Sequence, residues 1–200
     1  MLEFSDTATP DYRPAIVICA YEAGESGWDP VEDLSGEPWN PPGARTVAVA
    51  ANDPEVLAAT LSDHLGDPQC RALLLVGRTR AGGDDFRVQV RAVNRSLDGT
   101  GRLDEVGPGV ARATAPVADM VRALTESGLA AEVSSEAEDD AGSYLLYRVL
   151  SSLPEGADTP AIGLLRAPED AADAVVQKAV KTAAQAMARH LSPLPRSRAS

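Results

Sequence analysis

Short apolar runs recur along the chain, and most of them have the length and β-branched character of strands that are buried on both faces. The pattern predicts such strands at 15–21, 45–51 and 72–77, and further strands at 129–135 and 161–167. Residues 86–93, FRVQVRAV, alternate strictly between apolar and polar positions instead, which predicts a strand with one face in water. Residues 95–115 are polar and Gly-rich, so we expect a long excursion there.

Apolar residues at helical spacing separate these strands. Asn52 or Asp53 is expected to cap a first helix, with Pro54 in its first turn and one apolar face made by Val56, Leu57, Leu61, His64 and Leu65. Further helices are predicted at 116–127, ending at Gly128, from near Asp140 to 153, and over 168–191. The pair Gly82 and Gly83 marks a loop.

Strands that alternate with helices predict a three-layer α/β/α sandwich with a largely parallel central sheet. The domain organisation that we expect is a polar N-terminal leader over 1–13, a single α/β domain over 14–191, and a disordered tail over 192–200. The 200 residues suffice for one compact core.

Composition narrows the partners. The formal net charge of -12 argues against nucleic acid, because binding to phosphates depends on Lys and Arg. The sequence has no apolar run of the roughly 20 residues that a membrane span needs, and its first residues lack the pattern of a secretory signal, so we expect a cytoplasmic protein. Cys19 and Cys70 are expected to be buried thiols. Because only two of the 18 basic residues are lysines, the composition indicates a GC-rich bacterial genome.

Four segments, AYEAG (20–24), QVRAVN (89–94), AGSYLLY (141–147) and GLLRAP (163–168), resemble in their order and spacing the motifs of one known family. That family is pyroglutamyl peptidase I, also called pyrrolidone carboxyl peptidase, a cytoplasmic cysteine peptidase that removes N-terminal pyroglutamate. The segment AGSYLLY (141–147) resembles the family's Ala-Gly-Thr-Tyr-Val-Cys-Asn motif, and GLLRAP (163–168) its Gly-Phe-Ile-His-Val-Pro strand end. QVRAVN (89–94) resembles Glu-Arg-Val-Ala-Ile-Asn. AYEAG (20–24), followed by Asp29-Pro30, resembles the aromatic Gly-Phe-x-Pro-Phe loop, in which Tyr21 keeps a ring that in the family holds the substrate.

The resemblance implies that the catalytic triad has been lost. Leu146 stands at the cysteine, Arg166 at the histidine and Gln89 at the glutamate, while Tyr147 stands at the asparagine. Leucine has no lone pair, and an arginine with a pKa above about 12 cannot shuttle a proton at neutral pH. Hydrolysis by the family's mechanism is therefore excluded if these positions correspond.

No other residue set predicts a catalytic or metal site. Ser143, one helical turn before Leu146, could act as a nucleophile, but a cap or packing role is favoured. A serine nucleophile needs a base, and the only histidines, His64 in the first helix and His190 next to the tail, are not expected to serve as one. The acidic cluster 136–140 and Asp84-Asp85 are expected to be solvated loops. GRTRAGG (77–83) is interpreted as a turn. We expect neither a metal nor a cofactor.

Arg166 leaves two interpretations open. Beside the helix N-terminus at 140–143, its guanidinium would attract a carboxylate ligand. Arg78 and Arg80 could contribute to the same ligand site, because ligands of open α/β sheets bind at the carboxyl ends of the strands. The interpretation that we favour is an ion pair with Asp139, Asp140 or Glu169.

Two functions follow from these residues. The first is a catalytically inactive relative that binds a small acidic or peptide-like ligand, or a protein partner, through the remnant pocket. The second is a repurposed enzyme of a specialised biosynthetic pathway that uses polar groups of the same pocket. The candidate pocket residues are Tyr21, Glu22, Arg78, Gln89, Ser143, Tyr144, Leu146, Tyr147 and Arg166. A homo-oligomer is compatible with the resemblance.

Overall fold

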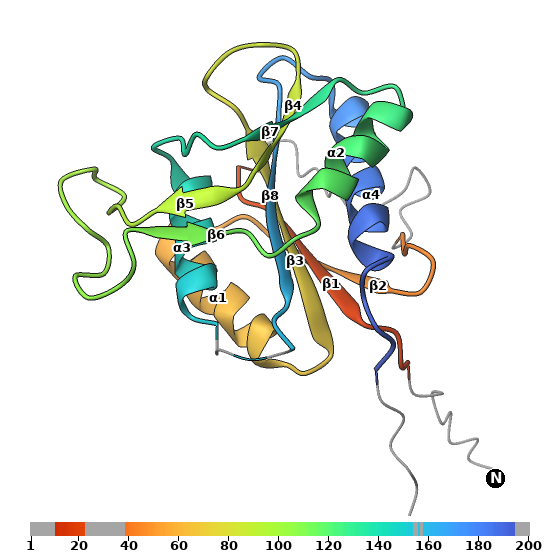
Figure 1. The fold of residues 1–200 in the computed structure, drawn as a ribbon, viewed down its shortest axis with the longest axis horizontal. Coiled ribbons are helices and arrows are strands. Elements are labelled where there is room, and N and C mark those ends of the chain that lie inside the picture. Colours follow the sequence, from red (N-terminus) through yellow and green to blue (C-terminus); the bar gives the residue numbers. More distant parts are fainter. Residues whose placement is uncertain (1–10, 23–38, 154–155, 157, 195–200) are drawn as a thin grey trace, which may run out of the picture.

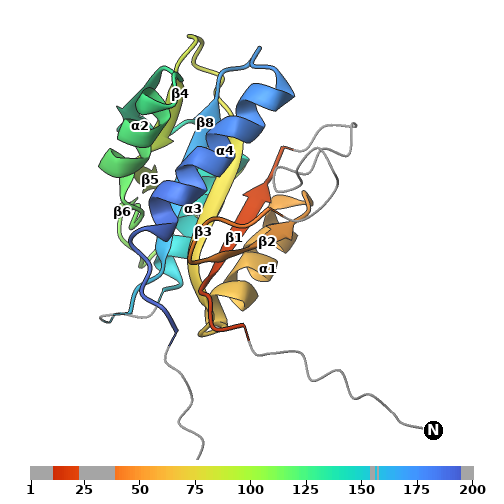
Figure 2. The ribbon, with the colours of Figure 1, turned by 90° about the vertical axis from the view of Figure 1, so that its right-hand side faces the viewer.

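A computed structural model describes residues 11–22, 39–153, 156 and 158–194. A central six-stranded sheet has the order β2-β1-β3-β8-β4-β7. Helices α1 (Pro54–Gly66) and α3 (Ala141–Ser151) cover one face, and α2 (Val117–Glu126) and α4 (Asp173–Ala188) cover the other (Figures 1 and 2). The bounds of the sheet strands are Arg45–Val49 (β2), Ala15–Ala20 (β1), Cys70–Arg78 (β3), Ala161–Ala167 (β8), Phe86–Gln89 (β4) and Ala131–Ser134 (β7).

The predicted fold class is confirmed. Strands β2, β1, β3 and β8 run parallel, β4 runs antiparallel to β8, and β7 is parallel to β4. The helices span Pro54–Gly66 (α1), Val117–Glu126 (α2), Ala141–Ser151 (α3) and Asp173–Ala188 (α4). As predicted, Asp53 caps α1 through the backbone NH of Glu55, and Asp140 precedes α3. Within the described ranges, each helix is too short or too polar to cross a membrane.

Alternation along the central strands divides the core into two layers. On β1, Ile16 and Ile18 face α2 and α4, whereas Val17 and Cys19 face α1 and α3. All four side chains are at most 1% exposed. The strand is therefore buried on both faces, as its continuous apolar run predicts.

The alternating segment 86–93 is two strands, and the prediction of one strand with a wet face is wrong. It divides at Val90 into β4 and β5 (Arg91–Val93), and β5 pairs with β6 (Val110–Arg112) in a separate two-stranded sheet. Strand β4 lies between β8 and β7, and the polar side chain of Gln89 is fully buried there, whereas that of Arg87 is partly exposed. The strand β6 lies inside the stretch that was expected to be an excursion without regular structure.

The connection between β5 and β6 is held by one buried amide, that of Asn94. Its Oδ1 accepts from the backbone NH groups of Leu103 and Asp104, both at 2.9 Å, and its Nδ2 donates to the carbonyl oxygen of Asp104 at 2.6 Å. Tyr147 of α3 adds a bond from its hydroxyl to the carbonyl oxygen of Pro108 at 2.8 Å. These contacts fix the polar segment, although it contains little regular structure.

The closing helix begins later than predicted. Residues 168–171 form a loop, because Nη1 of Arg78 binds the carbonyl oxygens of Pro168, Glu169 and Ala171 at 2.8–3.0 Å. A helix there would commit those carbonyl oxygens to its own backbone hydrogen bonds. The helix α4 then spans Asp173–Ala188 rather than 168–191.

Thr114 closes a gap beside β8. In the described part of the chain, β4 pairs with β8 only over Leu164, Leu165 and Arg166, which leaves the first half of β8 without a strand on that side. There the hydroxyl of Thr114 donates to the carbonyl oxygen of Pro160 at 2.6 Å and accepts from the backbone NH of Ile162 at 2.8 Å. The backbone NH of Thr114 donates to the carbonyl oxygen of Ile162 at 3.0 Å.

Candidate functional site

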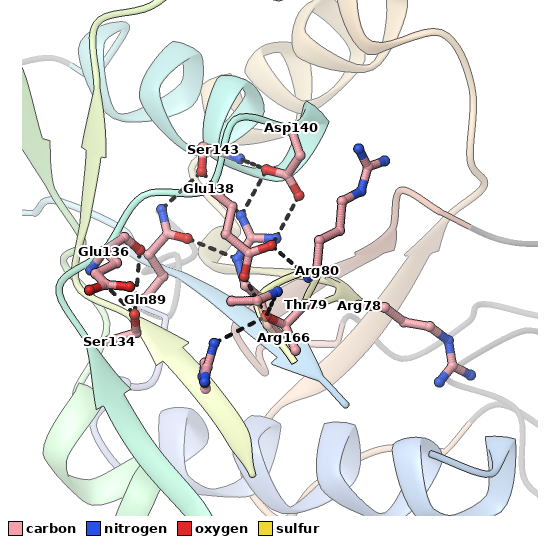
Figure 3. A network of polar contacts seen from close by, with 12 residues as sticks. Arg78, Thr79, Arg80, Gln89, Ser134, Glu136, Glu138, Asp140, Ser143 and Arg166 are labelled. Atoms are coloured by element: carbon pink, nitrogen blue, oxygen red, sulfur yellow. Dashed lines mark hydrogen bonds and ion pairs between the residues drawn. The ribbon is translucent and has the colours of Figure 1, made fainter. Parts of the chain in front are cut away.

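Arg166 stands at the centre of a buried polar network. It lies near the end of β8, beside Gly77 of β3 and Arg87 of β4, and faces the first residues of α3 (Figure 3). Its side chain is 1% exposed, and Arg166 is the bulkiest of the fully buried residues in the described part of the chain. A buried cation requires partners that replace its hydration, because an unpaired one would cost several kcal/mol.

All five N–H donors of this guanidinium have partners in the protein. Nη1 and Nη2 donate to the two carboxylate oxygens of Asp140 at 2.6 and 2.8 Å. Nε donates to Oε1 of Gln89 at 2.9 Å. The remaining donors reach the hydroxyls of Ser143 at 3.1 Å and Tyr21 at 3.2 Å. The guanidinium is thus satisfied from within, and an external anion would have to displace one of these groups.

Asp140 serves both the ion pair and the helix. Its Oδ1 also accepts from the backbone NH of Ser143 at 3.0 Å, which caps α3. Burial alone raises the pKa of Asp140, but the hydrogen bond and the charge of Arg166 more than offset this, and the pKa is lowered. Burial likewise disfavours the charged form of Arg166, yet Asp140 raises its pKa further above the usual range. The pair therefore stays ionised.

Glu138 supplies a second carboxylate, which sequence reasoning missed. It lies 3.7 Å from Nη1 of Arg166 and accepts from the hydroxyl of Thr79 and from the backbone NH of Arg80, the latter at 2.8 Å. Its side chain is 14% exposed. The prediction of a solvated acidic loop is thus wrong for Glu138 and Asp140. Asp140, at a helix start, offered a cap signal, whereas Glu138 carried no local signal.

Tyr21 points into the network rather than toward solvent. Its ring fits against two glycines: a Cβ atom at Gly77 would lie 2.1 Å from the phenol oxygen, and one at Gly142 would lie 2.2 Å from it. Such contacts are far shorter than van der Waals distances, so glycine is required at both positions while the ring is there. Burial raises the pKa of Tyr21 well above its usual value, which keeps the phenol neutral.

The amide of Gln89 and the hydroxyl of Ser143 are committed to internal contacts. Besides accepting from Arg166, Gln89 donates through Nε2 to the carbonyl oxygen of Arg91 at 2.8 Å and to Oγ of Ser143 at 3.2 Å. Oγ of Ser143 therefore receives two hydrogen bonds. His190 lies beyond the end of α4 and binds Asp119 at 2.8 Å instead. The geometry thus supports the structural role of Ser143, not that of a nucleophile.

The other predicted site residues of α3 are Tyr144, Leu146 and Tyr147. They pack in the core, and Tyr147 also contacts the segment between β5 and β6. Leu146 is fully buried in the apolar cluster that also contains Cys19. Tyr147 is fully buried and binds Pro108, as described above, and Tyr144 packs in the same cluster as Leu146. Cys19 and Cys70 are free and buried, and burial raises their pKa values to about 12 and about 11. Neither thiol is poised to become a thiolate.

The remaining predicted residues lie at the rim or outside it. Arg78 points away from Arg166 (Figure 3) and binds the loop before α4 and Asp173, at 3.2 Å. The interpretation that Arg78 contributes to the same ligand site as Arg166 is wrong. Arg80 is 73% exposed, and its Nη2 lies 3.9 Å from Oε1 of Glu22, whose other carboxylate oxygen accepts from the backbone NH of Arg78 at 3.0 Å. Gly24 and Asp29-Pro30 lie outside the described residues.

A small cavity of about 50 Å³ lies next to the network. Ser143 and Tyr144 contribute to its lining, together with Arg95 and Asp139, which form an ion pair with each other. Small-molecule sites usually measure about 300–1,000 Å³, so this cavity has room for a few water molecules and not for a ligand. Among the described residues, no group of His, Cys, Asp and Glu is arranged to hold a metal ion.

No family model and no curated protein matches this sequence. Solved structures do match. Pyrrolidone carboxyl peptidase from Thermus thermophilus is 20% identical with a TM-score of 0.67, and the match covers 86% of this chain and 98% of that one. Pyroglutamyl peptidase I from Bacillus amyloliquefaciens is 17% identical with a TM-score of 0.71, covering 89% and 98%. Pyrrolidone carboxyl peptidase from Thermococcus litoralis is 14% identical with a TM-score of 0.66, covering 89% and 94%. The chain therefore has the fold of the pyroglutamyl peptidases.

Proposed function

We propose that this protein is a non-catalytic relative of the pyroglutamyl peptidases that acts by binding. One observation carries the proposal: the guanidinium of Arg166, at the position that resembles the catalytic histidine, is buried and saturated by groups of the same chain. A histidine in that role must exchange a proton with a nucleophile and with the substrate. A permanently charged, fully bonded arginine does neither.

The neighbouring positions support the same conclusion. Leu146, which resembles the nucleophile position, packs in the core. Gln89, which resembles the position of the acid, holds Arg166 through its amide oxygen and cannot carry a negative charge. Loss of a triad member costs about 10⁴ to 10⁶ in rate in dissected enzymes, so replacement of all three leaves no basis for the peptidase reaction.

The saturated network also narrows where a ligand would bind. An acidic ligand at Arg166 would have to displace Asp140 or another internal partner, so this mode of binding is disfavoured. The exposed charges lie instead at the surface around the network, which we call the rim: the side chains of Arg80, Arg95 and Asp139 are about half or more exposed. We therefore place contact with a peptide-like or protein partner at this rim.

The second hypothesis, a repurposed enzyme, requires free acid or base groups in the pocket. Gln89, Ser143 and Tyr147 are each bonded to other groups of the protein. These contacts favour the non-catalytic proposal.

A peptidase assay tests the proposal. Purified protein is incubated with a pyroglutamyl amide of a fluorophore, and the Thermus thermophilus enzyme serves as the active control. We expect no release of the fluorophore above the rate of a C19S/C70S variant or of buffer. Turnover near that of the control enzyme would overturn the proposal.

Free pyroglutamate provides a separate test of the saturated site. We expect its addition to leave the melting temperature unchanged, because Arg166 has no donor to offer. A rise of several degrees that is abolished by the substitution Ser143→Ala would show that a ligand carboxylate enters the network.

A further inference from the structure

The slot that holds Tyr21 has the features of a binding site for a flat aromatic ring. Two glycines on different elements, Gly77 on β3 and Gly142 on α3, flank the hydroxyl end of the side chain, where a Cβ atom at either position would overlap the phenol oxygen and the adjacent ring carbon. The same side chain also belongs to the apolar cluster between the sheet and the helices α1 and α3. The ring is 7% exposed.

The inner end of the slot is polar and recognises a hydroxyl. Nη1 of Arg166 donates to the phenol oxygen of Tyr21 at 3.2 Å, and a carboxylate oxygen of Asp140 lies 3.5 Å from the same oxygen. A donor and an acceptor therefore meet at one point, which suits a group that both accepts and donates a hydrogen bond. Apolar flanks with one such polar end match an aryl hydroxyl.

Tyr21 lies just beyond the carboxyl end of β1. It follows the last residue of β1, and its backbone NH reaches the carbonyl oxygen of Val76 at 3.2 Å. The side chain enters the slot from this end. The side chain therefore packs between Gly77 of the sheet and Gly142 of α3.

We propose that the slot is an aryl-hydroxyl site that the protein fills with its own Tyr21, so that Tyr21 acts as an internal ligand that blocks external phenols. The Arg166 network forms the floor of the site. The occupied slot explains why two glycines meet a single side chain. This inference does not depend on the peptidase assay, because the melting temperatures that test it can be measured whether or not the protein is catalytically active.

The first test is ligand rescue of Tyr21→Ala. Removing the ring is expected to lower the melting temperature by about 10 °C, and phenol at about ten times its dissociation constant restores about 3–5 °C. Toluene, which lacks the hydroxyl, restores less. Tyr21→Phe keeps the slot filled and serves as the matched control, for which phenol gives no shift. Equal shifts by phenol in the wild type and in Tyr21→Ala, or a shift in neither, would overturn the proposal.

A second test holds even when Tyr21→Ala does not fold. Alanine is normally favoured over glycine inside a helix by about a factor of five in the folding equilibrium, yet Gly142→Ala must collide with the ring. We expect this single substitution to lower the melting temperature by several degrees. The control is Gly66→Ala at the end of α1, where a Cβ atom meets open space and we expect no loss. A melting temperature for Gly142→Ala at or above that of the wild type would mean that Tyr21 does not fill the slot.

Discussion

The carboxylate of Asp140 binds the guanidinium of Arg166 through both of its oxygens, at 2.6 and 2.8 Å, and caps α3 with one of them. One side chain thus fixes the first turn of the helix against the end of β8. The two residues are separated by the rest of α3 and the whole connection to β8, so the pair also joins distant segments. Its geometry is the bidentate form, which is stronger than a single contact.

Removal of the cation alone should be costly. Arg166→Met leaves the carboxylate of Asp140 buried without its partner, and we expect the free energy of unfolding to fall by about 3–5 kcal/mol. The double variant with Asp140→Asn should lose less than the sum of the two single variants, because neither Arg166 nor Asp140 is then left as a buried charge without the other. Urea unfolding of the four proteins measures the coupling.

A control is available in the exposed pair of Arg122 and Asp119, whose atoms are 2.9 Å apart. Arg122→Met is expected to change stability by less than about 1 kcal/mol. If Arg166→Met cost no more than this control, the network would have no structural importance.

Acid should weaken the same contact. Because the folded-state pKa of Asp140 is lowered from its usual value of 3.8, its stabilisation is fully present above that value and is lost as the pH falls through the folded-state pKa. The difference in unfolding free energy between the wild type and Asp140→Asn should therefore be largest at neutral pH and shrink in acid. Urea midpoints across that range measure it. A difference that does not change with pH would contradict the ionised pair.

The two thiols should resist alkylation. With pKa values raised to about 12 and about 11 by burial, Cys19 and Cys70 are almost wholly protonated at neutral pH, and the thiol is far less reactive than the thiolate. Intact-mass measurement after iodoacetamide should show no adduct on the native protein and two adducts in urea. Rapid labelling of one native thiol would reveal a reactive cysteine and reopen the question of a nucleophile.

The polar segment between β5 and β6 should depend on Asn94. Asn94→Ala removes three hydrogen bonds from a buried position and is expected to cost about 1–3 kcal/mol. Hydrogen exchange should increase at the backbone NH groups of Leu103 and Asp104. Asn94→Asp keeps the acceptor for both groups and loses only the donor, so we expect it to retain more protection than Asn94→Ala. Equal exchange in both variants would contradict this role.

The sequence predicts most of the fold because the central strands are buried on both faces and therefore consist of continuous apolar runs. The start of α3 was predictable from Asp140, whose side chain suits a cap. The division at Val90 was not, because β4 and β5 continue one alternating pattern. Only contacts with segments distant in the sequence show that Gln89 faces Arg166 rather than water.

The candidate site was predictable in its members but less so in its contacts. The position of Arg166 beside the start of α3 was predicted, and Asp140 was one of three carboxylates expected to pair with it. The saturation of all five donors also requires Gln89, at the end of β4, and Tyr21, which follows β1. Glu138 and the two glycines beside Tyr21 carry no local signal of these roles, because their partners are distant in sequence.

The hydroxyl of Thr114 has a consequence beyond the single molecule. A strand flank with free NH and carbonyl groups is a template on which another chain can add, and such additions propagate into fibrils. By bonding both Pro160 and Ile162, Thr114 occupies those groups at the first half of β8. Together with its backbone NH, which binds the carbonyl oxygen of Ile162, this hydroxyl leaves these groups unavailable to an added strand.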